Sequence, residues 1–152
     1  LGGAIVVVAI FVQILLGAFV AGLNAGFIFN TWPLMDGSFI PRHLYPFDSI
    51  WASAFEDVRT VQFNHRMFAY ALVVLVGWHY WKMNNSDLQV QQTGNWLLGA
   101  LLFQVFLGIA TILTVTRIEV ALLHQAGGAV LLLSVALFHL QNIGRTVHQS
   151  RL

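Results

Sequence analysis

Residues 61–81 read VQFNHRMFAYALVVLVGWHYW, a stretch that is apolar enough to lie in lipid although it carries His65 and Arg66 near its start. Polar groups inside a membrane cost free energy and usually serve a function. Three further runs carry little or no charge, namely residues 1–29, 96–115 and 120–143. Each of the four runs has the roughly 20 residues that a helix needs to cross a ~30 Å hydrocarbon core.

The composition supports the same fold class. Of the 152 residues, 58% are hydrophobic and only 9% are charged, against about 25% charged in an ordinary soluble domain. We therefore expect an all-α, polytopic membrane protein, folded as an antiparallel up-down four-helix transmembrane bundle with spans at about 2–28, 61–81, 95–115 and 120–143. The chain has no cysteine, which excludes disulfides, thiolate metal sites and cysteine nucleophiles. A net charge of +1 gives no case for binding nucleic acid.

The domain organisation follows from these spans. Residues 1–152 form one four-helix unit, and because the sequence opens inside a span without a signal-peptide pattern, we expect it to be part of a longer chain, cut at its N-terminal side. A long loop at 30–60, with all three prolines, joins the first two spans on what we term side X. Within it, residues 48–57 predict a short surface helix capped by Asp48.

The charges near the span ends leave the orientation open. Side X carries four arginines, and the opposite side, side Y, carries three basic residues. The positive-inside rule counts such residues, and a difference of four against three does not decide the sidedness.

An internal repeat links the two halves of the sequence. Residues 13–17 read QILLG and residues 104–108 read QVFLG. Each motif is followed by a span with a histidine about one turn in, His65 or His124. A helix pair used twice in the same orientation implies a pseudo-two-fold axis along the membrane normal.

His65 and His124 are the candidate metal ligands. Both are expected ~6 Å inside helices that start on side X, so their imidazoles share one depth. Diagonal helices of a bundle can both point side chains into the central space, and two facing imidazoles suit the bis-histidine ligation of haem iron. Zinc or copper also binds neutral imidazole, but no carboxylate or cysteine is near either residue in the sequence to complete such a site.

Further residues have two open interpretations each. Arg66 and Arg117 lie at the side-X boundary, where they could pair with haem propionates or reach the lipid headgroups as ordinary interfacial arginines. Gly127 and Gly128 could let a flat macrocycle approach the helix backbone, or serve plain small-residue helix packing.

A second pair of histidines has a similar spacing. His79 follows His65 by 14 residues, and His139 follows His124 by 15. Two stacked haems would use similar spacings, but at ~100° per residue the two offsets rotate in opposite directions. His79 also lies in an aromatic belt, so we interpret this pair as interfacial histidines.

The chain resembles the C-terminal half of haem A synthases. The resemblance rests on GAFVAGLNAGFIFNTWPLMDG (17–37), VQFNHR (61–66) and LLHQAGG (122–128), and it covers all four predicted spans. Members of that family are eight-helix proteins with two similar halves, and they oxidise a methyl group of haem O to the formyl group of haem A for cytochrome oxidase.

The resemblance implies a set of roles for this half. His65 and His124 would be the axial ligands of a haem b cofactor, and side X would face the periplasm or the intermembrane space. The substrate half of the family carries a glutamate three residues before its first histidine, where this chain has Gln62. A neutral amide cannot act as a carboxylate base, so these four helices alone are not expected to be catalytic. Haem O and haem A would then be bound by another half or by an oligomer.

Two other functions compete with a haem A synthase half. One is an electron-transfer membrane cytochrome b with one or two haems, and the other is a haem-free bundle such as a transporter or assembly scaffold. The number of haems per chain separates the three. Trp32 and Asp36 in the long loop are candidates for covering the haem or receiving an electron donor, whose identity the sequence does not give.

Overall fold

The computed structural model describes residues 2–149, and it describes side chains as far as residue 145. The described part is helical apart from turns, loops and one isolated bridge, which confirms the all-α prediction; the predicted domain of residues 1–152 extends slightly beyond it. The elements in chain order are α1 (Gly2–Gly22), η1 (Ala25–Phe27), α2 (Ile50–Glu56), α3 (Val58–Met83), α4 (Leu88–Leu113), α5 (Ile118–Ala126), η2 (Gly127–Leu132) and α6 (Leu133–Gln149).

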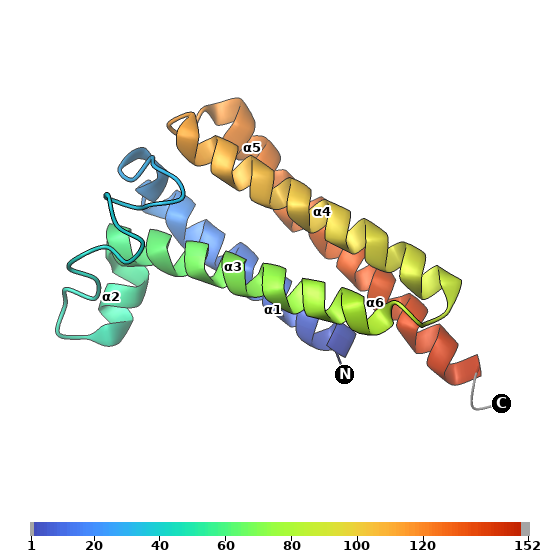
Figure 1. Ribbon diagram of the computed structural model, residues 1–152. Helices are drawn as coiled ribbons and strands as arrows, with labels where there is room; N and C mark the ends of the chain where they lie inside the picture. Colours follow the sequence, from blue (N-terminus) through green and yellow to red (C-terminus); the bar gives the residue numbers. More distant parts are fainter. Residues whose placement is uncertain (1, 150–152) are drawn as a thin grey trace.

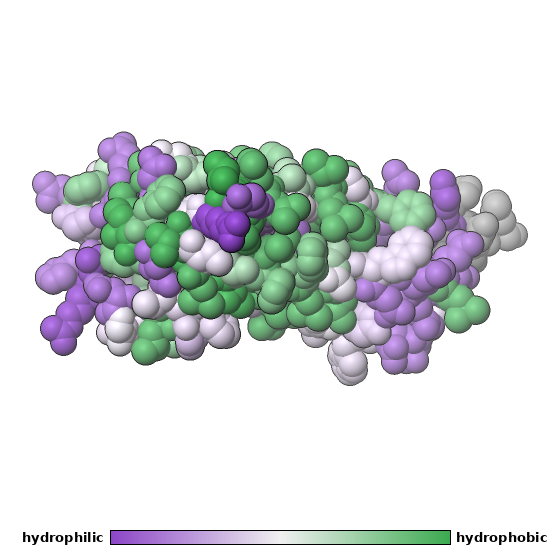
Figure 2. All heavy atoms as spheres, turned by 90° about the horizontal axis from the view of Figure 1, so that it is seen from above, coloured by the Kyte–Doolittle hydropathy of each residue, from purple (hydrophilic) through white to green (hydrophobic). Residues whose placement is uncertain are grey.

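Three helices are long and apolar enough to cross a membrane: Gly2–Gly22, Leu88–Leu113 and the continuous helix Ile118–Arg145 made by α5, η2 and α6. The chain is therefore a multi-pass membrane protein. Helix α3 is as long as α4, but its mean hydropathy is lowered by polar residues such as Arg59, Arg66 and Lys82. Apolar side chains cover a broad middle zone of the molecule, between hydrophilic ends (Figure 2).

The long helices are arranged as two antiparallel pairs (Figure 1). Helix α1 packs on α3, and α4 packs on the α5–η2–α6 helix. The pairs meet through α1 with α6 and through α3 with α4. They lie close together at the end with the chain termini and diverge toward the end that carries α2 and α5 (Figure 1). That diverging end corresponds to side X.

An apolar layer joins the two pairs near the middle of their length. Its buried members come from all four long helices: Val6, Ile10, Leu72, Val76, Leu97, Leu101, Leu132 and Ala136. Burying a side chain of this size removes it from water at a gain of roughly 1.5–3 kcal/mol in a soluble protein. In lipid, close packing takes over most of that role.

The helix ends differ from the sequence prediction in two details. Helix α1 ends at Gly22, about one and a half turns before the predicted limit, because Asn24 adopts a left-handed conformation with φ of 54°. The short helix in the long loop is present as α2. Its N-cap is Ser49, which accepts a hydrogen bond from the Ala52 amide, and not the predicted Asp48.

Candidate functional site

A large cavity opens between the diverging helix pairs at the side-X end. Its volume is about 740 Å³, within the ~300–1,000 Å³ typical of small-molecule and cofactor sites. All the long helices contribute to its walls, which are mostly apolar. His65, Arg66 and Gly128 are among the lining residues, as is His124.

The two predicted ligands face each other in this cavity. The ring centroids of His65, on α3, and His124, on α5, are 6.5 Å apart, and the ring planes are nearly perpendicular at 82°. Two nitrogens bound to one metal ion lie about 4 Å apart, because each metal–imidazole bond measures ~2.0 Å. The separation of the rings leaves room for a metal centre between them.

Each of these histidines lies against a glycine of the neighbouring helix. A Cβ atom on Gly17 of α1 would come within 3.1 Å of the His65 ring, and one on Gly108 of α4 within 3.0 Å of the His124 ring. These glycines close the two repeated motifs of the sequence. The structure thus gives the repeats equivalent places, with the same contact made once in each helix pair.

Glutamines precede these glycines by one helical turn. The Gln13 amide donates hydrogen bonds to His65 Nδ1 at 3.1 Å and to the His65 carbonyl at 3.1 Å. Gln104 is directed at Gly127 and Gly128, where it packs against the helix that carries His124. Sequence reasoning singled out both motifs as a repeat but did not assign their glutamines or glycines to the site.

Unpartnered polar atoms gather in this cavity. In residues 2–145, whose side chains the structure describes, each buried side-chain nitrogen or oxygen without a hydrogen-bond partner belongs to a residue of the cavity wall. These residues are Gln13, Gln62, Arg66, Gln104, Thr116 and His124. Native structures rarely leave such atoms unsatisfied, and each one calls for an explanation. Their concentration here indicates a polar or metal-bearing ligand.

Arg66 is buried and fastens the long loop. Its terminal nitrogens donate to the carbonyls of Thr31 at 2.9 Å and Phe29 at 3.0 Å. Its Nε atom has no partner and belongs to the cavity wall. Two of the five N–H donors of the guanidinium thus bind the loop.

Gln62 and the loop complete this wall. Gln62 Nε2 donates to the Phe29 carbonyl at 3.0 Å, while its Oε1 has no partner. Trp32 also lines the cavity. Asp36 is placed outside it, in an ion pair of 3.1 Å with Arg59, so its carboxylate helps to hold the loop.

Two predicted site residues are not brought into the cavity. Arg117 is exposed just before α5 and forms an ion pair of 3.0 Å with Glu119. Gly127 faces Gln104 instead of the open space, and a Cβ there would collide with the glutamine amide. The predicted contacts with propionate and macrocycle are therefore available to Arg66 and Gly128 only.

The second histidine pair differs from the sequence interpretation. His79 and His139 are 4% and 1% exposed, so both side chains are buried within the protein, whereas the sequence interpretation places them at its surface in an aromatic belt. Their Nε2 atoms are hydrogen-bonded at 3.0 Å, and the ring centroids are 5.2 Å apart. His139 Nδ1 is also bonded to the Thr93 hydroxyl at 2.7 Å. The rings are in direct contact, with no metal-sized space between them.

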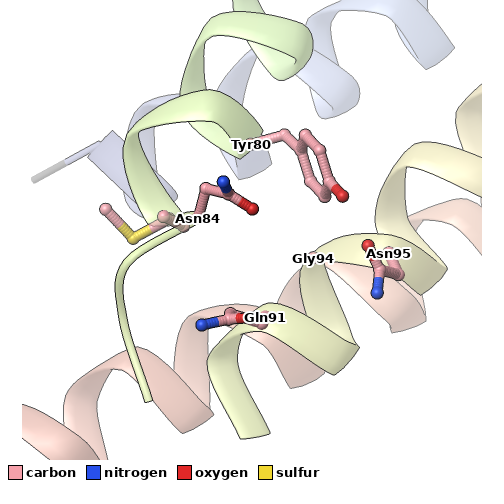
Figure 3. Close-up of a pocket in the computed structure, with 6 residues that line it drawn as sticks. Tyr80, Asn84, Gln91, Gly94 and Asn95 are labelled. Atoms are coloured by element: carbon pink, nitrogen blue, oxygen red, sulfur yellow. The ribbon is translucent and has the colours of Figure 1, made fainter. Parts of the chain in front are cut away.

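A small hollow lies beyond this pair, at the opposite end from the large cavity. It is lined by residues of α3 and its C-cap and by residues of α4: Tyr80, Met83 and Asn84, and Gln91, Gly94 and Asn95 (Figure 3). Its volume of about 40 Å³ suits a few water molecules at ~10–15 Å³ each. The large cavity is the candidate site.

Comparisons with known proteins identify the family of this chain. Residues 2–136 match the family described as cytochrome oxidase assembly protein. The chain is 42% identical to the haem A synthase of Parvibaculum lavamentivorans over 142 residues, which cover 93% of this chain and 40% of the relative. It is 43% identical to that of Bradyrhizobium sp. strain ORS 278, covering 88% and 38%, and 48% identical to that of Rhodopseudomonas palustris strain HaA2, covering 79% and 34%.

The chain spans about two fifths of the length of these curated relatives. No solved structure matches it. A match over most of the chain, together with relatives above 40% identity, establishes the family. The chain belongs to the cytochrome oxidase assembly protein family that includes the haem A synthases.

Proposed function

We propose that this chain is the cofactor-holding half of a haem A synthase, in which His65 and His124 are the axial ligands of a haem b. The observation that carries the proposal is the cavity between the facing imidazoles, where the unpartnered buried polar atoms of the described residues are concentrated. The whole protein would oxidise the methyl group of haem O to the formyl group of haem A. The relatives are named haem A synthases, and the oxidation of haem O is the reaction that the family resemblance implies.

The residues of the cavity fit a haem better than a bare metal ion. Among the side chains described, those of residues 2–145, no cluster of three or more histidine or carboxylate groups could hold an ion, whereas a haem brings its own equatorial ligands and needs two axial ones. The mostly apolar wall suits a porphyrin. Gly128 lines the cavity without a side chain that would fill the space for the porphyrin. The Arg66 Nε–H has no partner and can donate to a propionate.

Haem b, when bound, would supply one-electron redox chemistry. The protein residues position it and exclude water. Arg66 and Gln62 tie the loop carbonyl of Phe29 to α3, so the loop stays over the side-X mouth. Neither residue supplies a carboxylate at the site.

This division of labour makes the half non-catalytic by itself. Gln62 stands where the resembling family has its glutamate, and an amide cannot accept the proton that a carboxylate accepts. Substrate haem O and product haem A would be bound in another half of the longer protein or in an oligomer. The electron donor would approach on side X, where Trp32 and the loop cover the cavity.

The proposal includes a fourth membrane span. Helix α3 has 26 residues and packs against both α1 and α4, so its polar residues face protein or cavity and not lipid alone. With α3 crossing, the unit becomes an antiparallel four-helix bundle in a bacterial plasma membrane or mitochondrial inner membrane. Side X would then face the periplasm or the intermembrane space.

The test is haem A formation by the full-length protein in membranes. We expect His65→Ala and His124→Ala to abolish conversion of haem O to haem A and to lose one low-spin haem b signal. Asp87→Ala, at the far end of the bundle, is the matched control and should keep both. Conversion at the wild-type rate in either histidine variant would refute the assignment.

The alternative is an electron-transfer cytochrome b, which gains support from the burial of the second histidine pair. A protein of that kind would hold haem but leave haem O unchanged. The direct His79–His139 hydrogen bond of 3.0 Å argues against a second haem at that level. Retention of haem b without any haem A formation by the full-length protein would favour this alternative.

A further inference from the structure

The glutamines of the two repeated motifs have no role in the function proposed above. Gln13 and Gln104 occupy the same motif position on α1 and α4, one turn before the glycines that contact His65 and His124. Both carboxamides are in the cavity wall. Gln13 Oε1 and both polar atoms of Gln104 are buried without partners.

We propose that Gln13 and Gln104 are positioning residues, and that each accepts a hydrogen bond from the ring nitrogen of its histidine that does not bind iron. This inference rests on the proposed haem site. An imidazole that binds a metal through one nitrogen carries a proton on the other, and that N–H almost always has an acceptor. In an apolar bundle, few other acceptors are within reach.

On the first helix pair, Gln13 already contacts its histidine, but through its amide nitrogen as a donor. Gln13 holds the His65 carbonyl through one N–H of its amide, and the same nitrogen lies 3.1 Å from His65 Nδ1. Its Oε1 atom, on the same carboxamide, has no partner. Once His65 binds iron and carries a ring proton, a rotation of the carboxamide would turn this oxygen toward the ring N–H.

On the second pair the groups are present but unpaired. His124 Nδ1 is buried without a partner, and so is the Gln104 carboxamide. Gln104 lies against Gly127 and Gly128, which are three and four residues after His124 and therefore on the same face of its helix. The absence of a side chain at Gly127 is what admits the glutamine to this position.

A hydrogen bond of this kind has an electronic effect. It makes the imidazole a stronger donor, which stabilises ferric over ferrous iron and lowers the midpoint potential. Two such bonds, one on each axial ligand, would set both the orientation of the rings and the potential of the haem. The repeat would then supply, in each helix pair, both the histidine ligand and the glutamine that accepts its hydrogen bond.

The experiment uses the full-length protein with its haem, purified from membranes. Gln13→Leu and Gln104→Leu should each raise the haem dissociation constant by about 10- to 100-fold and raise the midpoint potential. Each tenfold change in the ratio of ferric to ferrous affinity corresponds to about 59 mV. Gln13→Glu and Gln104→Glu supply a stronger acceptor, and we expect them to lower the potential.

Gln91→Leu is the matched control, since the Gln91 amide bonds to the Ser86 carbonyl away from the cavity, and it should change neither quantity. The inference is overturned if the leucine and glutamate variants leave the potential unchanged or move it in the same direction. Where a leucine variant does not fold, the direction in which the glutamate variant shifts the midpoint potential decides. If His65→Ala and His124→Ala keep their haem, the proposed function fails instead.

Discussion

Gly17 and Gly108 set how closely the neighbouring helices approach the two histidine rings. A methyl group at either position would come within 3.0–3.1 Å of a ring carbon, closer than unstrained contacts between carbon atoms of ~3.5–4.0 Å. The ring, held between this glycine and the cavity, would have to turn. At this scale the geometry of the site depends on two missing side chains as much as on the ligands.

Gly108→Ala should therefore weaken haem binding, because the added methyl group displaces the His124 ring. We expect at least a tenfold rise in the haem dissociation constant, comparable to the loss of a hydrogen-bond partner of a metal ligand. Gly99→Ala on the same helix meets nothing within 4 Å and should bind haem as the wild type does. Equal affinities for the two variants would show that the ring is not confined in this way.

Gln62→Glu tests whether this half tolerates the glutamate that the substrate half of the resembling family carries at the equivalent position. The Gln62 side chain is buried and donates to the Phe29 carbonyl, whereas an ionised carboxylate only accepts. Losing the bond and placing a carboxylate against the Phe29 carbonyl oxygen should cost about 1–3 kcal/mol in the free energy of unfolding. Gln89→Glu, at an exposed position in α4, is the control in thermal unfolding, and a Gln62→Glu protein as stable as this control would contradict the argument.

At the scale of elements, η2 explains how the histidine layers match. His79 follows His65 by 14 residues, and His139 follows His124 by 15. Regular α-helices would therefore rotate the second histidines about 100° apart. The π-helix Gly127–Leu132 lies between His124 and His139, and a π-bulge takes up one extra residue. With that residue absorbed, both second histidines reach the same level and meet.

Deleting one residue from η2 should accordingly be tolerated. Without the exposed Val130, the segment can continue as a regular α-helix with the 14-residue spacing of α3, so haem content and thermal stability should stay near the wild-type values. Deletion of Val74, equally exposed but in the regular helix α3, would turn His79 by about 100° and should destabilise the protein. If both deletions were equally harmful, the register argument would be wrong.

The second histidine pair acts as a polar contact between the helix pairs at the inner end. Replacing one member by leucine leaves the other buried without its partner, at a cost of about 1–3 kcal/mol, whereas replacing both can be nearly neutral. We expect His79→Leu and His139→Leu each to lower the unfolding midpoint, and the double variant to lose less than the sum of the two. Strict additivity in such a double-mutant cycle would mean that the rings are not coupled.

At the scale of the whole molecule, the helices and one histidine pair could be predicted from the sequence, because hydropathy and spacing are local properties. Sequence reasoning did not find that His79 and His139 are buried in contact, since the π-helix that corrects their register has no clear signature in the sequence. It also missed that Arg66 holds the loop and that Arg117 turns outward to Glu119. The Arg66 contacts depend on where the 31-residue connection folds back, which no periodicity records, and Arg117 is drawn outward by a residue only two positions away.

The two histidine layers are separated by the apolar layer of the bundle. Along α3, Leu72 and Val76 come between His65 and His79, and both are buried. The cavity ends at this layer, so one level of the bundle is open and the other is closed by a direct hydrogen bond. We therefore expect the four helices to carry a single haem, at the side-X level.

The number and ligation of haems is the measurement that tests this claim most directly. Titration of the haem-depleted protein with haem, followed by optical spectroscopy, should show one low-spin haem b site in this half. That site should vanish in His65→Ala and His124→Ala and persist in His79→Ala and His139→Ala. A second haem lost with His79 or His139, or a site that survives without His65 and His124, would contradict the account.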